Sequence, residues 1–140
     1  MLDLYSRSCA LIGPAGSGQL CKMVNQICVA GVVQGLAEGL NFGRRAGLDM
    51  EKVISVISQG AARSWQMESR WQTMCEGRFD GFGFAVDWMR KDLGICLEEA
   101  KKNGARLPVT ALIDQFYAQI QARGGRRWDT SSLMQLLAKD

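Results

Sequence analysis

The sequence predicts an all-α fold, a helical bundle around one long central helix. Only two prolines, Pro14 and Pro108, occur in 140 residues, so long helices meet few breakers. Apolar side chains recur at helical spacing along most of the chain, and capping residues or glycines separate the apolar runs. The composition, 47% hydrophobic and 22% charged, is typical of a globular protein, and the length is enough for one domain with its own core.

The first helix is expected to begin near Ser17, as its N-cap, and to end near Ala46, with Gly47 as the stop. A length of about 30 residues far exceeds the usual ~11–12 of a globular helix. Two apolar stripes run along this helix, which predicts burial at the centre of a bundle or between the subunits of a homodimer. The first stripe is Leu20, Met23, Val24 and Ile27, and the second is Val29, Val32, Val33, Leu36 and Leu40.

Small residues on this helix lead to two further expectations. Glycine recurs every four positions, at Gly31, Gly35, Gly39 and Gly43. Each glycine costs about 1 kcal/mol against alanine, so we expect close approach of another helix to compensate. Cys21 and Cys28 lie in the same apolar helix and are expected in the core, where free cysteine is commonly found.

The remaining elements follow from caps and stops. The opening segment, residues 1–12, is short and shows no regular pattern. Residues 9–12 suit a brief strand, but no partner strand is expected in the sequence that follows. We therefore interpret 1–12 as the remnant of an interdomain junction. Residues 13–140 form the helical domain, with a loop at 77–83. Further helices are expected from the Asp49 cap to Gly60, from the Ser64 cap to Gly77, from Ala85 to Asn103, from Pro108 to Gly124, and in a short last helix capped by residues 129–132.

The composition excludes several classes of function. The chain has no histidine, so it cannot build a Ser-His-Asp or Cys-His nucleophile system. Its five cysteines form no CxxC pair, so no metal site is expected, and an odd number without a signal peptide indicates a reducing, cytoplasmic location. A net charge of +3 does not by itself indicate nucleic acid. The longest apolar run, residues 27–33, has about seven residues against the ~20 that span a membrane, so no membrane segment is expected.

A glycine-rich turn precedes the first helix. Gly13, Gly16 and Gly18 are followed by Gln19, whereas a Walker loop needs lysine there, and Cys21 stands where a dinucleotide fingerprint needs its third glycine. These glycines therefore indicate a tight turn that a ligand can approach closely.

Lys22 is the most informative residue of this segment. Asn25 and Gln26 follow three and four positions later, on the same helical face. We interpret Lys22 as a proton donor and acceptor for a small polar substrate, sheltered by a closing partner domain. Asn25 would orient that substrate through its amide.

Residues 13–26 closely resemble the turn and catalytic helix of the 3-hydroxyisobutyrate dehydrogenase family. These β-hydroxyacid dehydrogenases include tartronate semialdehyde reductase and relatives of 6-phosphogluconate dehydrogenase. The family has a Rossmann nucleotide-binding domain followed by an all-helical domain, and this chain resembles the second domain only. The likeness continues, in order, through residues 35–39, 46–49, 60–65, 84–93, 107–110 and 129–132.

The resemblance implies a role for each matching residue. Lys22 matches the catalytic lysine and Asn25 the substrate-contacting amide, with Gln26 where many members carry a second asparagine and Gly18 in the substrate-binding turn. The cofactor side of the cleft is matched by Lys91, Phe84 and Asp92.

The resemblance also implies the reaction, which is hydride transfer between NAD or NADP and a small 3-hydroxy acid or its semialdehyde. The missing Rossmann domain would bind most of the cofactor. Two alternatives stay open from sequence alone. The first is a non-catalytic helical dimerisation module that lacks a nucleotide-binding domain. The second is a nucleic-acid binder that uses the basic loop at residues 123–127.

Overall fold

The computed structural model describes residues 10–137 and folds them into six helices joined by short connections. They are α1 (Ser17–Arg45), α2 (Met50–Ile57), α3 (Trp65–Glu76), α4 (Val86–Asn103), α5 (Pro108–Ala122) and the 3₁₀ helix η2 (Thr130–Leu136). Within 10–137 the only β pairing is an isolated bridge between Ala85 and Asp129. The all-α prediction is therefore confirmed, and residues 10–12 form no strand; the rest of the predicted opening segment lies outside the described residues.

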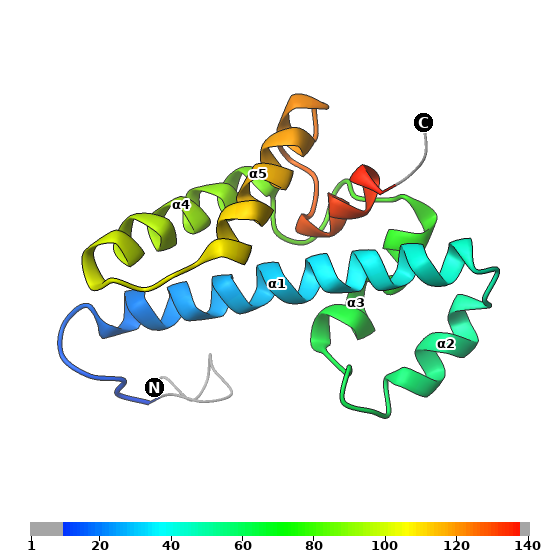
Figure 1. Cartoon of the computed structure of the whole chain (residues 1–140), viewed down its shortest axis with the longest axis horizontal. Coiled ribbons are helices and arrows are strands. Elements are labelled where there is room, and N and C mark those ends of the chain that lie inside the picture. Colours follow the sequence, from blue (N-terminus) through cyan, green and yellow to red (C-terminus); the bar gives the residue numbers. More distant parts are fainter. Residues whose placement is uncertain (1–9, 138–140) are drawn as a thin grey trace.

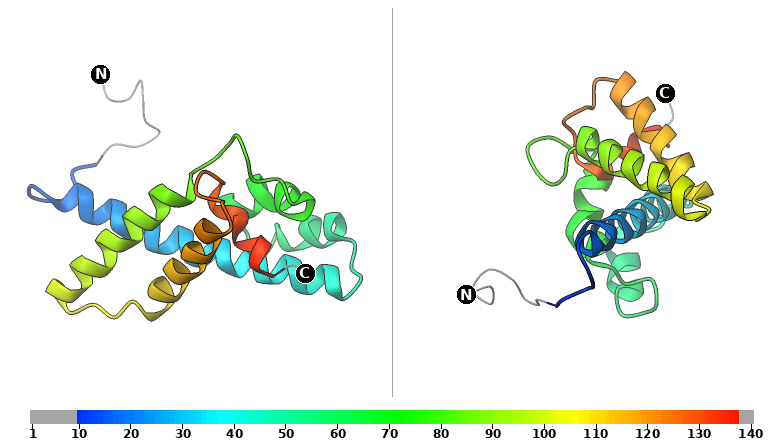
Figure 2. Two further views of the ribbon diagram at one scale, coloured as in Figure 1. Left: turned by 90° about the horizontal axis from the view of Figure 1, so that it is seen from above. Right: turned by 90° about the vertical axis from the view of Figure 1, so that its left-hand side faces the viewer.

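Helix α1 crosses the whole molecule, and every other element is arranged around it (Figure 1). Helices α4 and α5 pack against each other and against α1, while η2 and α3 also contact α1. Viewed along α1, helices α4 and α5 lie to one side and α2 to the other (Figure 2). The predicted bundle around one central helix is confirmed, and α1 leaves part of its surface outside that bundle.

The helix ends follow local chemistry. Gly16, with φ 95°, is the N-cap of α1, so the prediction of Ser17 as the cap is wrong by one position. The left-handed conformation there suits a glycine. The caps at Asp49 and Ser64 are confirmed, since their side chains accept hydrogen bonds from the N–H groups of Lys52 and Met67. Helix α2 ends at Ile57 instead of Gly60.

The core lies where α1 meets α3, α4, α5 and η2. Tyr117 of α5 is fully buried at its centre, and its hydroxyl donates to the carbonyl of Thr130 at 3.2 Å. Full burial of an apolar core side chain such as Leu133 is worth about 1.5–3 kcal/mol. The surrounding core includes Ala30, Val33, Ala37, Leu40, Met89, Leu93, Ile113, Ile120 and Leu133.

The opposite face of α1 is exposed in this chain. Val24 is 61% exposed and Val32 40%, so only part of the two predicted stripes is buried here. Cys21 and Cys28 lie on the exposed surface too, and the prediction that they are core residues is wrong. The reason is that the helices packed on α1 leave these positions uncovered.

The predicted close approach along the glycine edge of α1 is correct at one position. A Cβ at Gly43 would lie 2.8 Å from the sulfur of Met50, so the Met50 side chain of α2 packs closely over this glycine. At Gly31, Gly35 and Gly39 no atom lies within 4 Å of an added Cβ, so the prediction is wrong for these three within the chain.

By length and composition α1 is apolar enough to cross a membrane, although its longest uninterrupted apolar run is short. The core helix of a soluble protein passes the same test. Helix α1 contacts all five other elements and is the central helix of this bundle, although only 28% of its most apolar 18-residue window is buried. The absence of a membrane segment stays a prediction.

Candidate active site

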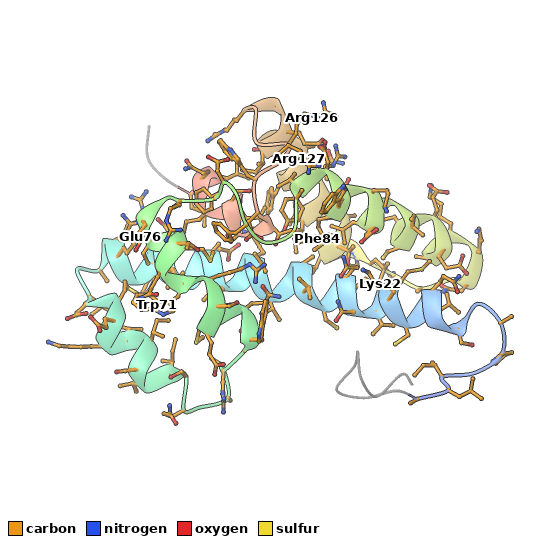
Figure 3. The ribbon with its side chains drawn as sticks, turned by 180° about the vertical axis from the view of Figure 1, so that it is seen from behind. Lys22, Trp71, Glu76, Phe84, Arg126 and Arg127 are labelled. Atoms are coloured by element: carbon orange, nitrogen blue, oxygen red, sulfur yellow. The ribbon has the colours of Figure 1, made fainter. Side chains whose placement is uncertain are left out.

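Lys22 lies at the mouth of a cavity between α1 and α4. The cavity has a volume of about 490 Å³ and is lined by Gly18, Gln19, Lys22, Met23, Gln26, Asp92 and Ile95. The structure thus brings together four of the predicted site residues from two distant stretches of sequence. The Lys22 side chain is exposed, and its ammonium nitrogen lies 5.7 Å from the centre of the Phe84 ring (Figure 3). This is a cation–π contact, in which the ring face attracts the ammonium.

Two amides and a carboxylate link α1 to α4 beneath Lys22. Gln26 is only 5% exposed, and its side-chain N–H donates to Oδ2 of Asp92 at 2.8 Å. The side-chain N–H of Asn25 donates to Oε1 of Gln26 at 2.9 Å. The Nζ of Lys91 lies 3.5 Å from the other carboxylate oxygen of Asp92. Asn25 and Lys91 do not line the cavity, but this network connects both to it.

Phe84 is held by the loop that precedes α4. Its N–H donates to Oδ2 of Asp129 at 2.8 Å, and its carbonyl accepts from the N–H of Thr130 at 3.0 Å. Gly83, immediately before it, has φ 75°, and an added Cβ would overlap the Asp129 carboxylate. Its ring lies 5.7 Å from that of Trp88. The ring facing Lys22 is therefore fixed from both sides by backbone and packing.

The anchor of this loop is a buried ion pair between α3 and the segment before η2. Arg70 binds Asp129 through two bonds, Nε to Oδ1 at 2.9 Å and Nη2 to Oδ2 at 3.0 Å. Burial raises the pKa of Asp129, but hydrogen bonds from Arg70, Ser131 and the Phe84 N–H outweigh it and hold this pKa below its usual range. The sequence identified Asp129 only as a helix cap, and the cap bond to the Ser131 N–H does exist at 3.0 Å. No sequence signal pointed to Arg70.

The basic loop at residues 123–127 makes contacts within the chain. Arg126 pairs with Asp87 at 3.4 Å, and Arg123 donates to the carbonyl of Gln135 at 3.1 Å. The Arg127 guanidinium lies 4.8 Å from the Trp88 ring centre. These contacts give each arginine a partner within the chain, but all three stay exposed, so the nucleic-acid alternative stays open.

The chemistry available here is that of a lysine beside hydrogen-bonding amides. An ammonium can give a proton to a substrate oxygen, and the amides can orient that substrate. Among residues 10–137 no group of three or more His, Cys, Asp or Glu side chains is placed to hold a metal ion.

Comparison with known proteins defines the class. Residues 16–137 match the family described as the NAD-binding domain of NADP-dependent 3-hydroxyisobutyrate dehydrogenase. The chain therefore belongs to the 3-hydroxyisobutyrate dehydrogenase family, whose members are NAD-dependent hydroxyacid dehydrogenases.

Individual relatives agree with this assignment. An uncharacterized oxidoreductase of Shewanella frigidimarina is 66% identical over 99% of this chain and 47% of its own length. The 2-hydroxy-3-oxopropionate reductase of Escherichia coli is 34% identical over 98% of this chain and 47% of its own length. The structure of 3-hydroxyisobutyrate dehydrogenase from Mycobacterium tuberculosis, solved with L-serine, has a TM-score of 0.80 and 25% identity, covering 91% of this chain and 46% of that one. The chain thus spans about half the length of the proteins it matches.

Proposed function

We propose that residues 13–140 are the C-terminal catalytic and dimerisation domain of an NAD(P)-dependent 3-hydroxyacid dehydrogenase. Residues 1–12 would belong to the junction with a nucleotide-binding domain. The observation that carries the proposal is the position of Lys22, which lies at the mouth of a cavity beside Gln26 and Asp92, in a segment that matches the family.

Lys22 is the general acid and base of the proposed reaction. When the alcohol of a small 3-hydroxy acid is oxidised, its carbon loses hydride and its oxygen loses a proton, which Lys22 accepts. In the reverse direction the ammonium returns the proton to the carbonyl oxygen of the semialdehyde. Phe84 would contribute a weak attraction to the ammonium, which lies 5.7 Å from the ring centre. Gly18 and Asn25 would contact the substrate.

A nicotinamide nucleotide, NAD or NADP, would supply or accept the hydride. The residues available on this chain fit a partial cofactor site: Lys91 is a two-thirds exposed cation, and Asp92 at 14% exposure anchors it from the cavity side. Phe84, whose ring lies beside Lys22, would add an aromatic surface to the site. Most of the cofactor would be bound by the nucleotide-binding domain, whose closure would also shelter Lys22 from water.

The exposed apolar face of α1 supports a homodimer. Leu20, Val24 and Val32 lie exposed on one long helix, and a second copy would cover them. The same face also favours the second candidate, a non-catalytic dimerisation module. The exposed thiols of Cys21 and Cys28 suit a reducing, cytoplasmic location.

The test is kinetic. This chain is joined to the part of the Shewanella frigidimarina relative that it does not match, and the chimera is assayed with 3-hydroxy acids and NAD or NADP. Lys22→Ala should lower kcat at least about 100-fold, the lower bound for general acid–base catalysis. Lys52→Ala, which changes an exposed lysine paired to Asp49, is the matched control and should leave kcat unchanged.

Two outcomes would count against the proposal. If the intact Shewanella frigidimarina relative turns over these substrates and the chimera does not, the result would favour the non-catalytic dimerisation module. A Lys22→Ala chimera within about tenfold of the unmutated chimera would remove Lys22 from the chemistry.

A further inference from the structure

Gln26 is buried, and its polar atoms face other groups of the protein. Its side-chain nitrogen carries two hydrogens. One points to Oδ2 of Asp92 at 2.8 Å, and the sulfur of Met89 lies 4.0 Å from the same nitrogen. Its oxygen accepts from Asn25, and the residue is 5% exposed. Although Gln26 lines the cavity, its polar atoms are committed within the protein.

The direction of this hydrogen-bond chain is set at Asp92. A carboxylate can only accept, so Gln26 must turn its nitrogen toward Asp92 and its oxygen toward Asn25. Asn25 must then donate through its own nitrogen, as the 2.9 Å bond to Gln26 shows. The oxygen and nitrogen of an amide side chain are assigned from their hydrogen bonds. Here the carboxylate of Asp92, which can only accept, determines the orientation of both amides.

Asn25 uses one of its two amide hydrogens on Gln26, which leaves its side-chain oxygen and one hydrogen for other partners. Its side chain is exposed and lies one turn from Lys22 on α1. With its nitrogen directed to Gln26, the side-chain oxygen of Asn25 is the acceptor presented to solvent. A substrate hydroxyl is the natural donor for such an oxygen.

We propose that Gln26 is a positioning residue that acts through Asn25, and that the Asn25 oxygen accepts a hydrogen bond from a hydroxyl of the substrate. The inference rests on the proposed function of the site. Of the two neighbouring amides, only Asn25 would contact the substrate. Asp92 would set the direction of the hydrogen bonds that orient both amides.

The length of Gln26 matters for this role. Replacing it with asparagine removes one methylene and shortens the reach by about 1.5 Å. The bond to Asp92 would then stretch to about 4 Å, beyond hydrogen-bonding distance. The longer amide is therefore what lets α1 reach the carboxylate on α4.

A double-mutant cycle in the chimera tests the inference. Gln26→Met keeps the side-chain volume and removes the amide; it should raise KM for the hydroxy acid about 3- to 10-fold, the range of one hydrogen bond, with kcat changed less than about twofold. Combined with Asn25→Ala it should have no further effect, because Gln26 would act only through Asn25. Additive losses would overturn the inference and make Gln26 a direct ligand. Gln34→Met, a buried glutamine of α1 bonded to Glu38, is the matched control and should not change KM.

A second measurement needs no activity. In the NMR spectrum of the 140-residue chain, Gln26→Met and Gln26→Asn should shift the side-chain amide signals of Asn25, whereas Gln34→Met should not. Unchanged Asn25 signals in both Gln26 variants, with the fold retained by circular dichroism, would overturn the inference. An inactive chimera with shifted Asn25 signals would contradict the proposed function and still support the hydrogen-bond chain, so the two failures are distinguishable.

Discussion

Replacing Asp129 with asparagine breaks the ion pair that anchors the Phe84 loop. The carboxylate accepts from Arg70 Nε, the Ser131 N–H and the Ser131 hydroxyl at Oδ1, and from Arg70 Nη2 and the Phe84 N–H at Oδ2. Every partner is a donor, and an amide nitrogen cannot accept. In whichever orientation the substituted amide settles, its nitrogen therefore faces at least two donors.

The expected loss in the free energy of unfolding is large because both partners of the ion pair are buried. The Arg70 and Asp129 side chains are 8% and 0% exposed. Breaking a buried pair by removing one charge costs about 3–5 kcal/mol, because the other charge stays buried without compensation. For a chain of this size that corresponds to a fall in Tm of about 10–20 °C.

Thermal and denaturant unfolding followed by circular dichroism measure this cost. Glu76→Gln is the matched control, since its pair with Arg78 is more than half exposed and worth less than about 1 kcal/mol. The double variant Arg70→Met/Asp129→Asn should be more stable than Asp129→Asn, because it leaves no buried charge unpaired. A loss in Asp129→Asn no greater than in Glu76→Gln would refute this reasoning.

The same carboxylate predicts a pH dependence. Because the folded pKa of Asp129 is lowered, its contribution to stability is present above the unfolded pKa and is lost as pH falls toward the folded pKa. Below about pH 4, the unfolded value of an aspartate, the unmutated chain should therefore lose stability more steeply than Asp129→Asn. Parallel pH profiles for the two chains would contradict this.

Three further predictions concern the loop and the exposed face of α1. Gly83→Ala should destabilise by at least about 2 kcal/mol more than Gly81→Ala, because both glycines have positive φ but only the former would overlap a carboxylate; equal losses would contradict the geometry. Sedimentation should show a dimer that Val24→Asp converts to a monomer, and a monomeric unmutated chain at high concentration would argue against the interface. In the Val24→Asp monomer, iodoacetamide should modify exposed Cys21 at least about tenfold faster than Cys96, whose pKa burial raises; similar rates would contradict the burial of Cys96.

Local chemistry made most of the helices predictable. Asp49 and Ser64 cap the starts of α2 and α3, and Gly77 and Gly104 follow the ends of α3 and α4, as the sequence indicated. These signals act within a few residues, so no tertiary information is needed to see them. The predicted start of α1 is one residue late because a left-handed glycine, Gly16, takes the place of the usual polar cap.

Which side of α1 is covered could not be predicted. Its apolar residues lie on two faces, and hydropathy does not tell a face packed inside the chain from one left exposed, as Val33 and Val32 show. Cys21 and Cys28 were misplaced for this reason. The family resemblance predicted that Gly18, Lys22, Gln26 and Asp92 belong to one site. The structure places all four along one cavity.

The Arg70–Asp129 pair was beyond sequence reasoning for a different reason. The two residues lie 59 positions apart and meet only when α3 and the segment before η2 pack together. Neither shows a pattern that distinguishes a buried charge from a surface one. The connection from this pair through Phe84 to Lys22 is visible only in three dimensions.

Chemical rescue tests the central claim, that Lys22 carries the proton, most directly. In the Lys22→Ala chimera, added methylamine should restore turnover in proportion to its concentration, because a free amine can occupy the vacated position and exchange the proton. The Lys52→Ala chimera should not respond. A Lys22→Ala chimera that keeps turnover within about tenfold of the unmutated chimera and gains nothing from the amine would contradict the account.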